Sequence, residues 1–244
     1  MSANPPSSGA GSTNDRAVVA AATRAVELVH DGARVGLGTG RAAAAFVAGL
    51  AARVREGLRI TGVPTSASTA RLARDLGIPL IELDGDVELD LTVDGADEVT
   101  PSLDLVKGRG GALVRERIVA AASRQQVILV GPEKLVAGLG ETGPIPLEVI
   151  PFAVGPVSRR VRALGLEPVV RRHGDAPALT DNGNVSLDCS VPAPIADPEQ
   201  ARRLEQALRA VPGVVDTGLF LGTAEIVLVG HPDGRVDERR RGGS

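Results

Sequence analysis

Two spacings of apolar residues alternate along the chain up to Val130. Helical spacing, with apolar side chains three or four residues apart, predicts helices over residues 16–29, 41–56, 65–76 and 111–123. Short apolar runs predict strands over residues 33–37, 58–63, 78–83, 89–93 and 126–130. Strands that alternate with helices in this way are typical of βαβ units, so we predict an α/β fold with a Rossmann-like, doubly wound sheet.

The pattern changes near Gly140, where residues 141–146 read Glu-Thr-Gly-Pro-Ile-Pro and interrupt regular structure. Beyond this segment the spacing predicts helices over residues 154–164 and 198–210, and strands over residues 168–172, 185–187, 214–221 and 224–229. Two helices among short strands, without the earlier alternation, indicate a smaller α+β unit.

We therefore predict two domains. A Rossmann-like main domain comprises residues 15–140 and 212–236, and a small α+β domain over residues 141–211 is inserted before the last strands of the main sheet. The two ends, residues 1–14 and 237–244, are rich in small or charged residues, and we expect them to form a disordered leader and a disordered tail.

Composition excludes several function classes. With 27 basic and 30 acidic residues the net charge is −3, so no overall positive field attracts nucleic acid, and the three Phe residues offer no stacking platform for single strands. No apolar run approaches the roughly 20 residues of a membrane span, and no signal peptide is recognisable. A single cysteine, Cys189, excludes an intrachain disulfide and a multi-cysteine metal site. We therefore expect a cytoplasmic protein without nucleic-acid or membrane partners.

A glycine-rich turn, Gly36-Leu-Gly-Thr-Gly40, joins the first predicted strand to a helix, and residues 38–43 fit the dinucleotide pattern G-x-G-x-x-A. Its glycines let backbone amides approach an anion at a helix N-terminus. The second strand, however, lacks the acidic residue that a dinucleotide site uses for ribose. We therefore predict a phosphate-binding turn; a glycine turn needed only for packing is the alternative. The predicted contacts are Gly38, Thr39, Gly40 and Arg41. Hydroxyls of residues 65–69 either add to this site or cap the next helix.

Three carboxylates, Asp94, Asp97 and Glu98, lie within five residues at the end of an apolar strand. Crowding of this kind raises the pKa of one carboxyl group and suits acid–base chemistry. A capped turn or a metal site is the alternative, but no histidine is near in sequence to complete a set of metal ligands.

A lysine loop follows, in which Lys107 precedes Gly108, Gly110 and Gly111 at the start of a predicted helix. A cation beside exposed amides forms a binding site for an oxyanion. Glu116 lies early in this helix, where a solvated surface side chain is the alternative. The groups together suit proton transfer next to the carbonyl of a small phosphorylated substrate, and none requires an organic cofactor.

The combination of motifs resembles ribose-5-phosphate isomerase type A. The matching segments occur in family order over about residues 18–230, which is nearly the whole of the chain that we expect to be ordered. They are residues 36–40, 93–99, 107–116, 144–151, 180–185 and 212–220. The resemblance implies interconversion of D-ribose 5-phosphate and D-ribulose 5-phosphate through an enediolate, with no metal and no cofactor. It also implies a Rossmann-like domain with a smaller α/β domain, assembled as a homodimer or homotetramer.

The resemblance also implies roles for single residues. Glu116 is similar to the base that moves the proton between C1 and C2, Asp94 to its acid–base partner, and Lys107 to the group that stabilises the enediolate. Asp97 resembles a sugar-binding aspartate and Thr39 a phosphate or sugar contact. Lys134, in a Gly-Pro-Glu-Lys segment, stands where the family often has a lysine on the substrate side.

Two positions depart from the family pattern. Arg41-Ala42 stands where the family often has Ser-Thr, and we predict that Arg41 supplies a cation for the phosphate. Arg109 interrupts the usual glycine run, and the sequence leaves open whether its side chain contacts substrate or faces solvent.

Two other functions are alternatives. A CoA-transferase-like enzyme on the same scaffold would need an acyl-accepting glutamate or a catalytic histidine, and no histidine lies in the motifs. A non-catalytic sensor of sugar phosphates would normally carry a DNA-binding helix-turn-helix, and no basic recognition helix is recognisable.

Overall fold

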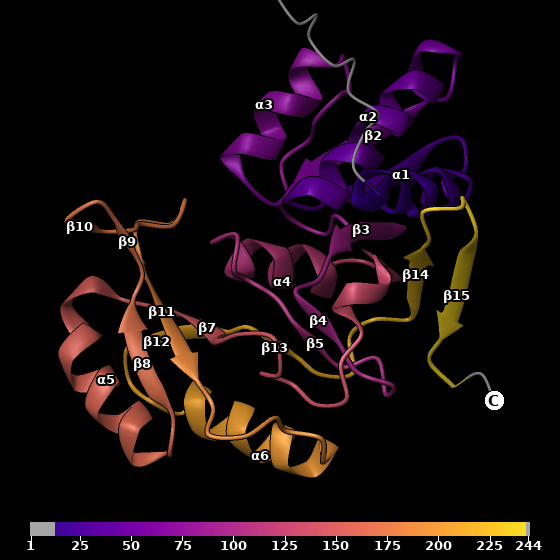
Figure 1. Cartoon of the computed structure of the whole chain (residues 1–244). Coiled ribbons are helices and arrows are strands. Elements are labelled where there is room, and N and C mark those ends of the chain that lie inside the picture. The colour runs from indigo at the N-terminus through magenta and orange to yellow at the C-terminus, as the bar shows by residue number, and fades with distance from the viewer. Residues whose placement is uncertain (1–12, 243–244) are drawn as a thin grey trace, which may run out of the picture.

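A computed structural model describes residues 13–242 of the chain, and its centre is a six-stranded sheet of order β15-β14-β6-β3-β1-β2 (Figure 1). The strands are β1 (Ala33–Leu37), β2 (Ile60–Pro64), β3 (Leu91–Gly95), β6 (Gln126–Val130), β14 (Ile226–Gly230) and β15 (Val236–Arg240). All neighbours are parallel except β15, which runs antiparallel to β14. The predicted Rossmann-like α/β sheet is confirmed.

Helices cover both faces of this sheet. On one face, α1 (Thr13–Val26) and α2 (Arg41–Arg55) enclose a core of Ala, Val and Leu side chains around Phe46. On the other face lie α4 (Leu113–Ala121) and a three-stranded sheet of β4 (Glu98–Val99), β5 (Leu105–Val106) and β13 (Leu219–Phe220). α3 (Ala67–Asp75) flanks β2. Among the described residues, no helix is long and apolar enough to cross a bilayer.

Strand β1 shows how the sequence builds both faces. Ala33, Val35 and Leu37 alternate into the core beneath α1 and α2. Gly36 points to the opposite face, where a Cβ would collide with Val119 of α4. Alternation of this kind is what a strand with two covered faces requires.

The strand order reverses at β1, because β2 lies on one side of it and β3 on the other. The carboxyl ends of β1 and β3 therefore flank a crevice, which is the usual ligand position in open α/β sheets. Leu37 pairs with Val93, so Gly38 and Asp94 come next to each other at this crevice.

A second, antiparallel sheet of order β12-β7-β11-β8 forms the small lobe at the lower left of Figure 1. Its strands are β7 (Ile145–Val149), β8 (Glu167–Val170), β11 (Val185–Ser190) and β12 (Val214–Thr217). The helices α5 (Val154–Ala163) and α6 (Pro198–Arg209) complete a separate core. Short strands β9 (Arg172–His173) and β10 (Ala176–Pro177) extend from β8.

Two features of the small lobe correct the sequence predictions. β12 pairs with β7, so this domain extends to Thr217 and does not end at residue 211. β7 begins within the segment that we expected to be irregular, although Pro146 cannot donate a hydrogen bond. Pro146 fits because its backbone faces Gly218, beyond the end of β12, where its oxygen accepts a hydrogen bond of 2.7 Å from Gly218 N.

The expected strand over residues 78–83 is wrong. This segment makes a single bridge, between Leu80 and Gly62. Pro79 lacks the N–H that a longer ladder would need, so pairing stops after two hydrogen bonds, Gly62 N to Pro79 O and Ile81 N to Gly62 O. β3 also runs further than expected and includes Asp94.

Both chain ends differ from expectation. Residues 237–240 belong to strand β15, so the predicted disordered tail is wrong there; a ladder to the buried strand β14 holds these charged residues. The first helix begins at Thr13, which places Asp15 in its first turn and not at the N-cap that the sequence indicated. Residues 13–14 of the predicted leader therefore belong to α1, and its residues 1–12 lie outside the described residues.

Candidate active site

Three predicted residues meet in one buried group, although they come from three parts of the fold. Asp94 lies in β3, Lys107 follows β5, and Glu116 lies in the first turn of α4. Lys107 Nζ is 3.0 Å from Asp94 Oδ2 and 3.2 Å from Glu116 Oε2, and none of the three side chains is more than 5% exposed. Lys107 also donates a hydrogen bond of 2.5 Å to the oxygen of Gly95.

Backbone contacts place the lysine between the two carboxylates. Lys107 N donates to Gly218 O at 2.9 Å, which ties the residue to the strand segment before β13. The Lys107 ammonium lies over the ring of Phe220, with Nζ 5.6 Å from the ring centre. Glu116 is near the N-terminus of α4, where the helix dipole favours a negative charge.

Burial and neighbouring charges set the protonation of this group. Burial raises the pKa of Glu116 well above its usual range, the charge of Asp94 raises it further, and Lys107 offsets part of this increase. Burial alone would lower the pKa of Lys107, but the charges of Asp94 and Glu116 outweigh it and raise this pKa. The arrangement therefore provides a firmly held ammonium group beside a carboxylate of raised proton affinity, which is what a general base near neutral pH requires.

Asp94 also fixes the glycine turn. Its Oδ1 accepts hydrogen bonds from Thr39 N at 3.0 Å and Gly95 N at 2.8 Å. A Cβ at residue 38 would overlap this carboxylate, so Gly38 is a glycine for close packing, which is the alternative that the sequence left open. Gly38 and Asp94 form the base of the site and do not line the cleft described next.

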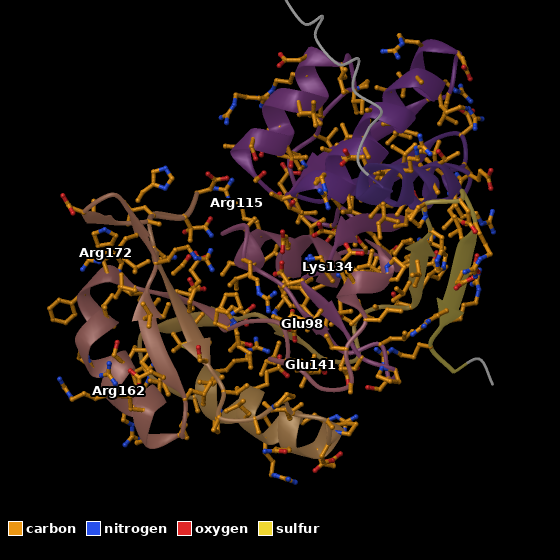
Figure 2. All side chains as sticks on the ribbon, in the orientation of Figure 1. Glu98, Arg115, Lys134, Glu141, Arg162 and Arg172 are labelled. Carbon is orange, nitrogen blue, oxygen red and sulfur yellow. The ribbon has the colours of Figure 1, made fainter. Side chains whose placement is uncertain are left out.

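A cleft of about 200 Å³ opens beside the buried group. Nine of the predicted site residues line it: Thr39, Gly40, Arg41, Asp97, Lys107, Gly108, Gly110, Glu116 and Lys134. Gly111 does not; its N–H bonds to Gly108 O at 3.0 Å and its φ of +82° turns the chain into α4. Figure 2 shows Glu98 between the two lobes and Lys134 on the main lobe, with Arg162 and Arg172 on the small lobe.

One end of the cleft offers backbone N–H groups to an anion. Gly40, with φ of +99°, precedes α2, and no side chain caps this helix start. Thr39 Oγ1 is 2.7 Å from Thr65 Oγ1 and 3.3 Å from Thr69 Oγ1. Ser66 caps α3 by accepting a hydrogen bond from Thr69 N. The hydroxyls of residues 65–69 thus cap a helix and hold Thr39.

Two cations border this end of the cleft. Arg41 is more than half exposed and lies 3.8 Å from Asp15 in an ion pair. The Lys134 ammonium makes no hydrogen bond or ion pair with the residues that the structure describes. Lys107 and Lys134 are the only lysines among the 27 basic residues of the sequence, and both line the cleft.

Arg109 takes neither of the two orientations that the sequence left open. Its guanidinium donates to Glu98 Oε1 at 2.7 Å and to Thr142 Oγ1 at 3.2 Å, away from the cleft. Its backbone N–H donates to Asp97 Oδ2 at 3.0 Å. Arg109 therefore bridges the lysine loop to the segment that leads into the small domain.

Sequence reasoning missed two groups near the cleft. Gly131 and Glu133 line it beside Lys134 at the end of β6, a position that the strand order would have indicated. Arg171, from the small domain, donates to Gly108 O at 3.2 Å and Arg109 O at 3.0 Å and is itself paired with Asp188. No local motif marks Arg171, because its partners in the lysine loop are more than 60 residues away in the sequence. Within residues 13–242, no three His, Cys, Asp or Glu side chains form a candidate metal site.

The fold and this geometry define a class: an α/β protein with an acid–base site for a small anionic ligand at the switch point of its sheet. Comparison with known proteins gives the family. The profile of ribose 5-phosphate isomerase A (phosphoriboisomerase A) matches residues 61–234. The chain is 50% identical over 220 residues to ribose-5-phosphate isomerase A of Roseiflexus castenholzii, covering 89% of this chain and 92% of that protein.

Solved structures of the same family are similar to this chain. The structure of ribose 5-phosphate isomerase A from Methanocaldococcus jannaschii superposes with a TM-score of 0.84 at 42% identity, over 91% of this chain and 97% of that one. A D-ribose-5-phosphate isomerase in complex with phospho-erythronic acid gives a TM-score of 0.88 at 37% identity, over 93% and 99%. The chain belongs to the ribose 5-phosphate isomerase A family.

Proposed function

We propose that this protein interconverts D-ribose 5-phosphate and D-ribulose 5-phosphate through an enediolate. The observation that carries the proposal is a cleft lined by Lys107 and Glu116, with Asp94 buried against Lys107 and with Lys134 and the N–H groups of a helix start at the other end. One structural relative binds phospho-erythronic acid, a phosphorylated acid whose planar carboxylate has the charge and shape of an enediolate. The cations and N–H groups of the cleft in this chain suit a ligand of that kind.

The proposed reaction moves one proton between adjacent carbons. The Glu116 carboxylate removes the C2 proton of the open-chain aldose and returns it to C1, while a proton passes from O2 to O1. The two sugars are isomers, so nothing else is gained or lost. The raised pKa of Glu116 makes its carboxylate a stronger base than an exposed one.

Negative charge develops on the two oxygens as the C2 proton leaves. The Lys107 ammonium and the amides of Gly108 and Gly110 are the groups that stabilise this charge. Asp94 does not line the cleft, but it keeps Lys107 charged and oriented. The family resemblance is the ground on which we propose that Asp94 also takes part in the proton exchange at the substrate oxygens. Asp97 lines the cleft between these groups and is proposed to bind sugar hydroxyls.

The phosphate group is proposed to lie at the N-terminus of α2. Gly40, Arg41 and Ala42 line the cleft there and offer the N–H groups of the helix start, with the Arg41 and Lys134 side chains as the cations. This placement leaves the carbonyl end of the sugar next to Lys107 and Glu116.

The experiment is an assay of the purified chain with ribose 5-phosphate in the presence of EDTA. We expect ketopentose phosphate to form, and deuterium from heavy water to enter C1 of the product. Acyl transfer from a CoA thioester would favour the CoA-transferase-like alternative. Tight sugar-phosphate binding without turnover would favour a sensor.

We also propose that the protein works in the cytoplasm as a homodimer or homotetramer, on the grounds of the family resemblance. The one cysteine, Cys189, is buried, and burial raises the pKa of its thiol to about 12, so it is not a reactive nucleophile. Light scattering after size-exclusion chromatography tests the assembly, and a monomer of 25.0 kDa would contradict it.

A further inference from the structure

Glu98 is a fully buried carboxylate that does not line the cleft, yet it stands next to Asp97, which does. Its Oε1 accepts hydrogen bonds from Arg109 Nη2, Thr142 N and Thr142 Oγ1, all at 2.7 Å. Its Oε2 accepts one of 2.6 Å from Gly140 N. Both oxygens are thus satisfied by the lysine loop and by the segment that enters the small domain.

Arg109 fits this position in shape as well as in charge. Its guanidinium lies against Gly143, where an added Cβ would come within 2.9 Å of Cζ and Nη2. Gly143 does not have a positive φ, so its backbone conformation does not require glycine. A larger residue at position 143 would therefore have to displace the Arg109 guanidinium from its place beside Glu98.

The backbone of Arg109 links its anchored side chain to the cleft. Its N–H holds one oxygen of Asp97 at 3.0 Å, and its neighbours Gly108 and Gly110 line the cleft. Arg171 holds the oxygens of Gly108 and Arg109 from the other side. The direction of the loop amides and of the Asp97 carboxylate therefore depends on where the Arg109 side chain is anchored.

We propose that Glu98 is a positioning residue that acts through Arg109. It orients the Asp97 carboxylate and the amides of Gly108 and Gly110 toward the oxygens of the sugar. The inference rests on the proposed function, because it concerns the same cleft. Glu98 acts on the sugar end alone, since the phosphate end is built on the turn after β1 and on Lys134 after β6. A defect in Glu98 therefore weakens binding of the reacting part of a ligand more than binding of its phosphate.

Calorimetric dissociation constants for two probes test this difference without requiring turnover. Inorganic phosphate reports the phosphate end, and a phosphorylated aldonic acid reports both ends. In Glu98→Gln the amide has one acceptor oxygen, so it cannot accept the hydrogen bonds of both Gly140 and Thr142. The substitution also removes the negative charge that holds Arg109. We expect the Kd of the aldonic acid to rise about tenfold or more, with that of phosphate changing less than about twofold.

Further variants keep the test decisive if Glu98→Gln does not fold. Arg109→Met leaves Glu98 its hydrogen bonds from Gly140 and Thr142, and Gly143→Ala displaces the guanidinium without removing a charge. Both should raise the Kd of the aldonic acid selectively, and Arg109→Lys, which keeps the charge, should recover part of the loss.

Two matched controls set the baseline. Glu88→Gln removes an exposed pair with Arg124, with N and O 2.6 Å apart, and Gly155→Ala adds a methyl group where nothing lies within 4 Å. Both should bind the two probes as the unaltered chain does. Equal weakening of both probes, weakening of phosphate alone, or aldonic-acid binding equal to the controls would overturn the positioning role. Failure of the unaltered chain to isomerise ribose 5-phosphate would instead overturn the proposed function.

Discussion

The two ends of the cleft are built in opposite ways. At the reacting end, Asp94, Lys107 and Glu116 are buried and paired with one another before any ligand binds. At the phosphate end, Arg41 is exposed and Lys134 has no partner among the described residues. The first end is preorganised by the protein, whereas the second is completed by the ligand.

Because of this difference, substitutions at the two ends of the cleft should have different effects. Charges at the reacting end are set by burial, so altering one changes the protonation and the stability of the others. Charges at the phosphate end are screened by water, so altering one changes mainly the affinity for the substrate.

Glu116→Gln should have the largest effect. The amide keeps the shape of the side chain but cannot take a proton, so kcat should fall by about 10³-fold or more with KM within about threefold. Steady-state kinetics measures both constants, and the melting temperature shows that the fold is intact. Turnover near that of the unaltered chain would assign the base to another residue.

Lys107→Met should reduce both activity and stability. Loss of the ammonium removes a charge that stabilises the enediolate, which lowers kcat by about 10²–10³-fold. It also leaves Asp94 and Glu116 buried without their cation, which should lower the free energy of unfolding by about 3–5 kcal/mol. Urea unfolding measures this loss. The loss should shrink at acidic pH, where Glu116, whose pKa is raised by burial, becomes neutral. A loss independent of pH would contradict the electrostatic account.

The pH profile should report the raised pKa of Glu116. Activity needs the ionised form, so kcat/KM should rise with pH and level off above a midpoint higher than the ordinary value of about 4.3 for glutamate. Asp94→Asn removes a negative charge that raises this pKa, so the midpoint should move to lower pH in whatever activity remains. A midpoint that stays in place would mean that Asp94 does not act on Glu116.

Substitutions at the phosphate end should have the smallest effects. Lys134→Met should raise KM for ribose 5-phosphate by about tenfold with little change in kcat, since an unpaired cation is lost. Arg41→Ser should raise KM less, because Arg41 is more exposed and already pairs with Asp15. Both effects should diminish at high salt. A fall in kcat with KM unchanged would contradict the division between the two ends.

Parallel topology explains why the sequence predicted the reacting end. Asp94 and the glycine turn each lie at the carboxyl end of a parallel strand, and such ends meet at one edge of the sheet. Lys107 and Glu116 belong to a glycine-rich loop and the helix start after it, a pattern that indicates an oxyanion site. The ion-pair distances among the three could not be predicted, because they depend on how β5 and α4 pack on the sheet.

Contacts between the domains were not predictable in the same way. Arg171 reaches the lysine loop from a strand pair that sequence spacing placed only approximately, and Arg109 finds Glu98 only when the segment at Thr142 is in place. The edge strand β15 was missed because its charged residues resemble a solvated tail, although its backbone pairs fully with β14. Contacts distant in the sequence decided the first two, whereas β15 pairs with the neighbouring strand β14 in a hairpin that its charged residues do not indicate.

The most direct test of the account is the fate of hydrogen during isomerisation in heavy water, followed by NMR. If Glu116 carries the proton from C2 to C1, solvent deuterium should enter C1 of the ribulose 5-phosphate formed by the unaltered chain, and Glu116→Gln should abolish both this labelling and turnover. Complete transfer of the C2 hydrogen to C1 with no solvent label, unchanged in Glu116→Gln, would show that hydrogen moves without this carboxylate.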